Sequence, residues 1–225
     1  MSRLSYRLCL VCCLLISACA DPLADSPLDA HEAEAAESTA NNPQDAGAAS
    51  TAAAANSQII KLTPQNTQIQ FVGTHTGDEP RPRTGVFTEF AGEAAVEKES
   101  GLPQSVWVDI QVKSLETPIQ KLTNHLKSPD FFDEKEYPTA KFKSTSISPQ
   151  EGSDEHLVTG KLTLMEATKE ISFPARITMS DGELKLKGGL TIKRTEYGMD
   201  KMLDGVNDEV EISVAIGQPT TVPTR

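Results

Sequence analysis

Few side chains in this sequence have the types and spacing that catalysis or metal binding requires. No two of its histidines share a metal-ligand spacing such as H-x-x-x-H, and no G-x-S-x-G nucleophile motif or phosphate-binding loop is present. The histidines are His31, His75, His125 and His156. We therefore expect no catalytic residue, no metal site and no cofactor.

All of the cysteines lie within the first 19 residues, so the rest of the chain has neither a disulfide framework nor thiolate ligands. They are Cys9, Cys12, Cys13 and Cys19. The net charge of −11 argues against a nucleic-acid partner, because phosphate binding needs a basic face.

Three polar residues are candidates for contact with the headgroup of a ligand. If the alternation of residues 184–192 continues, Arg194 points inward, and a buried guanidinium needs an anion. His125 is either a hydrogen-bonded structural residue or a headgroup contact, and Tyr197 is a third candidate. For Arg194 the anion is either a headgroup phosphate or carbonyl, or a nearby carboxylate of Glu196, Asp204, Asp208 or Glu209.

Apolar residues at every second position predict the strands that hold these side chains. The alternation runs through residues 106–112, 158–164, 171–179, 184–192 and 210–216. Such a pattern is typical of antiparallel strands with one buried face. Residues 59–217 suffice for about eight strands, and closure would remove the exposed edges. We predict an all-β, closed antiparallel up-and-down barrel, with a sandwich as the alternative.

The dipeptide Asp181-Gly182 predicts a two-residue hairpin, because such a turn needs positive φ at both positions. Folding the chain there pairs apolar or small residues on one face. The expected pairs are Met179–Leu184, Ile177–Leu186, Ala175–Gly188, Phe173–Leu190 and Ile171–Ile192.

A short helical cap is predicted between two of the strands. Thr117 can cap a helix whose first residue is Pro118, and the helix should end near Ser128-Pro129. Long ordered connections are often lids, so we expect Leu122, Leu126, Phe131 and Phe132 to cover one mouth of the barrel.

The segments LTNHLKSPDFFDEKEYPTAKFKST (residues 122–145), VTGKLTLMEATKEISF (158–173), GLTIKRTEYGM (189–199) and NDEVEISVAI (207–216) resemble the YceI-like family. The resemblance covers essentially the whole domain. It implies a lipocalin-like barrel with an elongated apolar cavity that binds polyisoprenoid chains or related amphiphiles in the periplasm. The chain departs from the family after His75, where it has a polar insertion with prolines.

The inward faces and the cap provide the predicted lining of a lipid-binding cavity. Small inward residues at Gly160, Ala175, Gly188 and Ala140 should leave room for a ligand. The predicted lining residues are Phe71, Phe87, Val108, Ile110, Leu122, Leu126, Phe131, Phe132, Phe142, Leu162, Phe173 and Leu190.

The N-terminus resembles a bacterial lipoprotein signal. Residues 1–18 have a short basic region followed by an apolar run too short to span a bilayer. Cys19 is then the expected lipidation site, unless cleavage is ordinary and Cys19 is an accident. Residues 19–58 are acidic, alanine-rich and predicted to be a disordered tether, and 218–225 a C-terminal tail. Ala20 after the cysteine favours the outer membrane over the inner.

The sequence thus favours a membrane-tethered protein that sequesters or carries a polyisoprenoid lipid or isoprenoid quinone. The alternative is an envelope stress or interaction lipoprotein whose barrel is solid and has no ligand. An enzyme acting on a lipid-like substrate is a third hypothesis. A homodimer is a further expectation about its partners.

Overall fold

The computed structural model describes residues 56–76 and 79–224, which form one antiparallel sheet with one α-helix and two 3₁₀ turns. The strands are β1 (Ser57–Leu62), β2 (Thr67–His75), β3 (Arg81–Phe87), β4 (Phe90–Glu97), β5 (Pro103–Gln111), β6 (Leu115–Glu116), β7 (Thr139–Pro149), β8 (Glu155–Leu164), β9 (Ala167–Ser180), β10 (Glu183–Lys193) and β11 (Val206–Ile216). The helical elements are η1 (Val112–Ser114), α2 (Gln120–Leu126) and η2 (Arg194–Tyr197).

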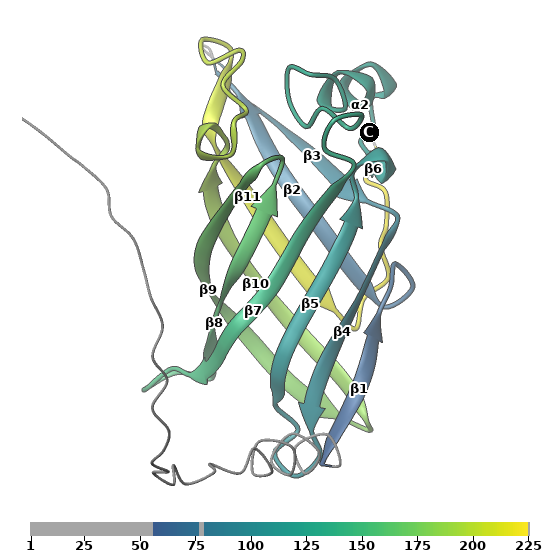
Figure 1. Cartoon of the computed structure of the whole chain (residues 1–225), viewed down its shortest axis with the longest axis vertical. Coiled ribbons are helices and arrows are strands. Elements are labelled where there is room, and N and C mark those ends of the chain that lie inside the picture. The colour runs from purple at the N-terminus through teal and green to yellow at the C-terminus, as the bar shows by residue number, and fades with distance from the viewer. Residues whose placement is uncertain (1–55, 77–78, 225) are drawn as a thin grey trace, which may run out of the picture. The chain divides into compact units, whose positions relative to one another are not determined.

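The strands follow the order β1-β4-β5-β7-β8-β9-β10-β11-β2-β3-β6, and every recorded pairing is antiparallel. Figure 1 shows the strands tilted and wrapped around a common interior, with α2 at one end. The prediction of an all-β antiparallel up-and-down sheet with one short helix is confirmed. The described sheet has eleven strands in an open order, where the sequence predicts about eight in a closed barrel.

The higher strand count arises because long stretches of alternation are interrupted. A turn held by the Asn66 side chain, which accepts the Thr63 N–H at 3.0 Å, separates β1 from β2. Thr88 and Glu89 separate β3 from β4, and η1 separates β5 from β6. The interruptions are tied together, because the Thr88 N–H donates to the Ser114 carbonyl at 3.1 Å and the Gln111 N–H donates to the Glu89 carbonyl at 3.0 Å.

The predicted hairpin between β9 and β10 is present. Asp181 and Gly182 have φ values of 54° and 78°. The pairs Met179–Leu184, Ile177–Leu186 and Ala175–Gly188 form as predicted. The recorded ladder ends there, so the expected pairs Phe173–Leu190 and Ile171–Ile192 are wrong. The next position on β9 is Pro174, which has no backbone N–H to donate to a neighbouring strand.

The helix α2 begins later than predicted. Its N-cap is Ile119, whose extended backbone (φ −123°, ψ 105°) keeps Pro118 outside the helix. Thr117 accepts the Ile119 N–H at 3.2 Å and contacts the Thr123 hydroxyl at 3.0 Å, forming a local turn before the helix. The helix ends at Leu126, close to the predicted stop before Pro129.

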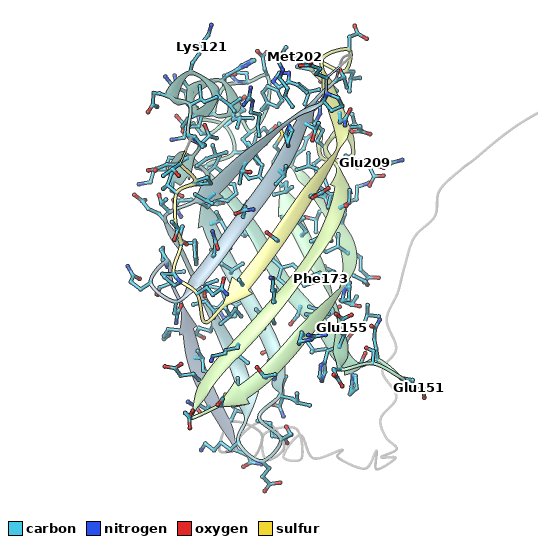
Figure 2. The ribbon with its side chains drawn as sticks, turned by 180° about the vertical axis from the view of Figure 1, so that it is seen from behind. Lys121, Glu151, Glu155, Phe173, Met202 and Glu209 are labelled. Carbon is cyan, nitrogen blue, oxygen red and sulfur yellow. The ribbon has the colours of Figure 1, made fainter. Side chains whose placement is uncertain are left out.

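Two clusters of apolar side chains face the interior of the sheet. We call them the cap-side core, which packs against Leu126 and Phe132, and the far core, which includes Leu62 and Leu184. Figure 2 shows Lys121 of α2 and Met202 of the loop after η2 at the same end of the sheet. We call this end the cap end.

The C-terminal tail runs past the turn between β1 and β2. Strand β1 starts at Ser57, two residues before the predicted domain start at Ile59. In the C-terminal tail, the Thr220 N–H donates to the Pro64 carbonyl at 2.7 Å and its hydroxyl donates to the Thr67 carbonyl at 2.6 Å. The predicted signal peptide, Cys19 and nearly all of the predicted tether lie outside the described residues. None of the helices in residues 56–76 and 79–224 has the length and hydropathy of a transmembrane span.

Candidate functional site: an apolar cavity inside the sheet

An apolar cavity of about 160 Å³ runs between the two cores. Its walls come from the inward faces of β1, β2, β3, β5, β7, β8, β9, β10 and β11, from Leu126 at the end of α2 and from the segment after it. Thr67, Gln70 and Arg194 are the polar residues along it, and every other lining residue is apolar or glycine. Such a cavity excludes charged ligand groups from most of its length and favours a hydrocarbon chain.

The cavity has different boundaries at its two ends. At the cap end it is bordered by Leu126, Phe131 and Phe132. At the other end the lining stops at residues such as Leu62 and Leu186. Beyond them the remaining side chains of the far core are buried against one another and do not border the cavity. These are Ala94, Val96, Ala175, Ile177 and Leu184. The far end is therefore a solid floor.

Aromatic rings surround the cap end of the cavity. Phe132 stands edge-on to Phe87, with ring centroids 6.0 Å apart, and lies 6.0 Å from Phe71. The predicted aromatic segment therefore packs against the interior of the sheet, as expected for a cap. Phe131 lies between two polar groups, with the His125 ring 5.1 Å from its centroid and the Arg194 guanidinium 5.8 Å from it.

Arg194 points inward, as predicted. Among the described residues, however, its hydrogen-bond partners are backbone carbonyls and not one of the expected carboxylates. Only 2% of the residue is exposed. Its guanidinium donates to four backbone carbonyls, at 3.0 Å to Asn207, 2.5 Å to Met199, 2.7 Å to Lys201 and 3.1 Å to Val206. Burial lowers the pKa of Arg194, and the charges of Asp208 and Asp200 oppose that shift. Arg194 therefore holds the loop between η2 and β11, while bordering the cavity.

His125 and Tyr197, the other headgroup candidates, do not border the cavity. The His125 Nε2 atom is 3.0 Å from the Asp130 carboxylate, which agrees with the structural interpretation of this residue. Tyr197 is 1% exposed within the cap-side core, and burial, followed by the nearby charge of Glu196, raises its pKa.

Of the predicted lining residues, all but Leu122 border the cavity. Leu122 lies on α2, where Thr123 is the residue that the helix buries. Sequence reasoning missed much of the wall from β11, including Val210, Ile212 and Val214, although their alternation was visible. These three residues are only partly buried because they border empty space.

The expected role of the small inward residues needs a correction. Ala140 borders the cavity, but Gly160, Ala175 and Gly188 do not. Space at Gly160 is occupied by the Phe142 ring, since a Cβ atom placed there would lie 2.6 Å from two ring carbons. The glycine therefore makes room for an aromatic side chain instead of for a ligand. Among the described residues, no group of His, Cys, Asp and Glu side chains could hold a metal ion.

Comparison with known proteins places this geometry among characterised folds. A family model for the YceI-like domain matches residues 61–217. A UPF0312 protein of Photorhabdus laumondii is 35% identical over 99 residues, which cover 44% of this chain and half of that relative. Protein YceI of Escherichia coli O157:H7 is 32% identical over 146 residues, covering 59% of this chain and 71% of the relative.

Two solved structures are similar in fold. Burkholderia cenocepacia BcnA has a TM-score of 0.59 and 26% identity, with 67% of this chain and 94% of that chain covered. A domain from Saccharophagus degradans, described as polyisoprenoid-binding and implicated in plant cell wall breakdown, has a TM-score of 0.52 and 13% identity. That alignment covers 67% of this chain and 91% of the domain.

Proposed function

Because the chain belongs to the YceI-like family, we propose that it is a binding protein for a polyisoprenoid lipid or an isoprenoid quinone. The observation that carries this proposal is the apolar cavity inside the sheet. A solid interior, which the alternative of a ligand-free interaction protein requires, does not fit that cavity. The description of the Saccharophagus degradans domain as polyisoprenoid-binding agrees with the same ligand class.

The energetics of burial support a water-insoluble ligand. Removing ~500 Å² of isoprenoid surface from water at ~25 cal/mol/Å² gives roughly 12 kcal/mol before the costs of association. A narrow cavity with few polar groups provides no comparable gain for a charged or compact ligand. The protein would act by sequestration or carriage, without catalysis.

We also propose that the sheet closes into a barrel. In support, β11 pairs with β2 through Ile212–Phe71, and β2 pairs with β3 through Phe71–Gly85. Only Thr88 and Glu89 separate β3 from β4, which pairs with β5. Following the pairs from β5 through β7 to β11 leads back to β2. Counting each interrupted pair of strands as one gives the predicted eight.

The proposed site of action is the cell envelope, with the chain anchored in a membrane through lipidated Cys19. This part of the proposal derives from the sequence of the leader. Mass spectrometry of the N-terminal peptide from membrane fractions would test it. A diacylglyceryl-modified peptide starting at Cys19 supports the anchor, and an unmodified start elsewhere contradicts it.

The ligand itself is tested by purifying the protein without lipid removal, extracting it with organic solvent and analysing the extract by mass spectrometry. We expect an isoprenoid at a ratio near one per chain. A protein that purifies empty and binds no isoprenoid alcohol or quinone would contradict the proposed function.

A matched pair of variants on β11 separates the cavity from the outer surface. Ile212 borders the cavity, and its neighbour Ser213 is exposed on the opposite face. Because an unpaired carboxylate in an apolar cavity is costly, Ile212→Asp should reduce the co-purified lipid by about ten-fold or more. Ser213→Asp should leave the lipid content unchanged. Circular dichroism of both variants controls for folding.

A further inference from the structure

Phe142 occupies the junction of the two cores. It packs against the cap-side core and also against the far core, and it borders the cavity between them. Its ring centroid is 6.0 Å from that of Phe173, at an interplanar angle of 53°. A ligand chain that extends from the cap end to the floor must therefore pass Phe142.

Gly160 on the neighbouring strand determines where the Phe142 ring lies. A Cβ atom at Gly160 would be 2.6 Å from the Cε2 and Cζ atoms of the ring, closer than side chains approach one another. Only the absence of that atom lets the ring lie against the wall of the sheet. The free width of the cavity at this level thus depends on the pair Phe142 and Gly160.

The cavity is long enough for isoprenoids of different length to reach different depths in it. Its lining on β11 extends from Val206 to Ile216. Ten steps of ~3.4 Å, at the strand tilt of ~40° usual in barrels, give about 25 Å along the axis. At about 1.2 Å per single bond, an extended ten-carbon isoprenoid spans ~8 Å and a twenty-carbon one ~18 Å. The shorter chain can stay on the cap side of Phe142, whereas the longer one cannot.

We propose that Phe142, seated on Gly160, is the residue that determines which chain lengths the cavity accepts. This inference rests on the proposed function, because it assumes an isoprenoid held with its headgroup at the cap end and its tail toward the floor. Phe142 limits the passage to the deeper part, which is bordered by Leu62, Val106, Val158, Leu186 and Ile216. Chains that reach this part gain its apolar contacts.

The test is a variant that narrows the passage. The larger ring in Phe142→Trp cannot fit the space over Gly160 and must project into the cavity. We expect the dissociation constant of twenty-carbon geranylgeraniol to rise about ten-fold, while that of ten-carbon geraniol stays unchanged. Isothermal titration of the full-length chain, stripped of lipid, measures both constants. Phe142→Leu, which removes the ring without adding bulk, should retain binding of both alcohols.

Phe71 offers a matched control at the cap end. Its ring lies over Gly85, where a Cβ atom would be 2.3 Å from the ring carbon Cζ, and it neighbours Phe132 of the cap. Every ligand passes this level, so Phe71→Trp should raise the dissociation constants of both alcohols by a similar factor. Folding of each variant is verified by circular dichroism.

The outcomes distinguish the inference from the proposed function. If the wild-type chain binds neither alcohol, the isoprenoid function itself fails. If the wild type binds both alcohols, and folded Phe142→Trp weakens the binding of both equally or leaves both unchanged, the role of Phe142 is overturned. The binding function then still stands. Gly160→Ala, which pushes the ring inward without changing it, should reproduce the selective loss if the variant folds. A folded Gly160→Ala chain with unchanged preference would also overturn the role of Phe142.

Discussion

At the scale of single residues, Arg194 stabilises the loop between η2 and β11 by hydrogen bonds to its backbone. The loop between η2 and β11 contributes the carbonyl groups of Met199 and Lys201, and the start of β11 contributes those of Val206 and Asn207; all four accept from one guanidinium. Buried carbonyls that lack partners are costly, so a planar group with several donors in fixed positions suits this place.

Replacing Arg194 should therefore destabilise the protein strongly. We expect Arg194→Met to lower the free energy of unfolding by about 3 kcal/mol, because it removes four hydrogen bonds donated by a charged group. Urea denaturation measures this change. Arg81→Met is the control, since Arg81 is exposed and makes an exposed ion pair with Glu79 at 3.6 Å. Equal effects of the two substitutions would contradict the role of Arg194.

Asp208, which lies beside this loop, makes a pH-dependent contribution to the stability of the fold. Its carboxylate accepts the Thr195 N–H and the Thr195 hydroxyl, each at 3.0 Å. The Thr195 backbone N–H is the main cause that lowers the pKa of Asp208, with help from the hydroxyl and the charge of Arg194. A lowered pKa means that the ionised form stabilises the fold.

We expect Asp208→Ala to lower the free energy of unfolding by about 1 kcal/mol at neutral pH. The difference from the wild type should be complete above the ordinary value of 3.8 and should disappear as the pH falls below it, through the lowered pKa. Denaturant titrations at a series of pH values measure this. A difference that persists undiminished at the lowest pH would contradict the assigned cause, and Glu209→Ala serves as an exposed control.

At this scale, the sequence predicts the direction in which a side chain points but not the groups that it contacts. The alternation of β10 correctly turns Arg194 inward, because side-chain direction is a local property of a strand. Two of its carbonyl partners, Met199 and Lys201, lie in a loop whose path no local pattern specifies. Gly160 was likewise recognised as an inward gap, but the ring that fills it belongs to Phe142 on another strand.

At the scale of elements, the hairpin between β9 and β10 was the most predictable part of the fold. Turn chemistry and apolar alternation independently specify one register, and a shift by one residue would expose the whole apolar face. Strand number was less predictable, because alternation on either side of the turn at Asn66 does not reveal the interruption. The start of α2 was misplaced because Thr117 forms a local turn with Ile119 before the helix begins.

The hairpin turn makes an element-scale prediction. Gly182 has φ +78° and open space around it, so a methyl group would meet no neighbour and would act only through the backbone. We expect Gly182→Ala to lower the free energy of unfolding by about 1 kcal/mol, measured by thermal or urea unfolding.

Asp181 provides the converse test of the same turn. Its φ of +54° is mildly unfavourable for a residue with a side chain, so Asp181→Gly should be neutral or slightly stabilising. A loss of stability larger for Asp181→Gly than for Gly182→Ala would show that side-chain contacts, and not backbone conformation, dominate the turn.

At the scale of the whole molecule, the cavity links ligand binding to stability. An apolar chain that binds only the folded state stabilises it by about 2.7 kcal/mol at a hundred-fold excess over the dissociation constant. For a domain of this size we expect the lipid-stripped protein to melt about 5–10 °C below the loaded one. Scanning calorimetry before and after extraction measures this. Restored melting temperature on adding isoprenoid, but not on adding detergent alone, completes the test.

The solid floor of the cavity has a consequence for the proposed carriage of a lipid. Since packed side chains occupy the far end, a ligand cannot pass through the molecule from one end to the other. If the protein takes up and releases a lipid, both steps would take place at the cap end, where Phe131 and Phe132 border the cavity. A carrier of this shape would exchange one ligand at a time, so a donor and an acceptor would have to approach the same end of the protein, one after the other.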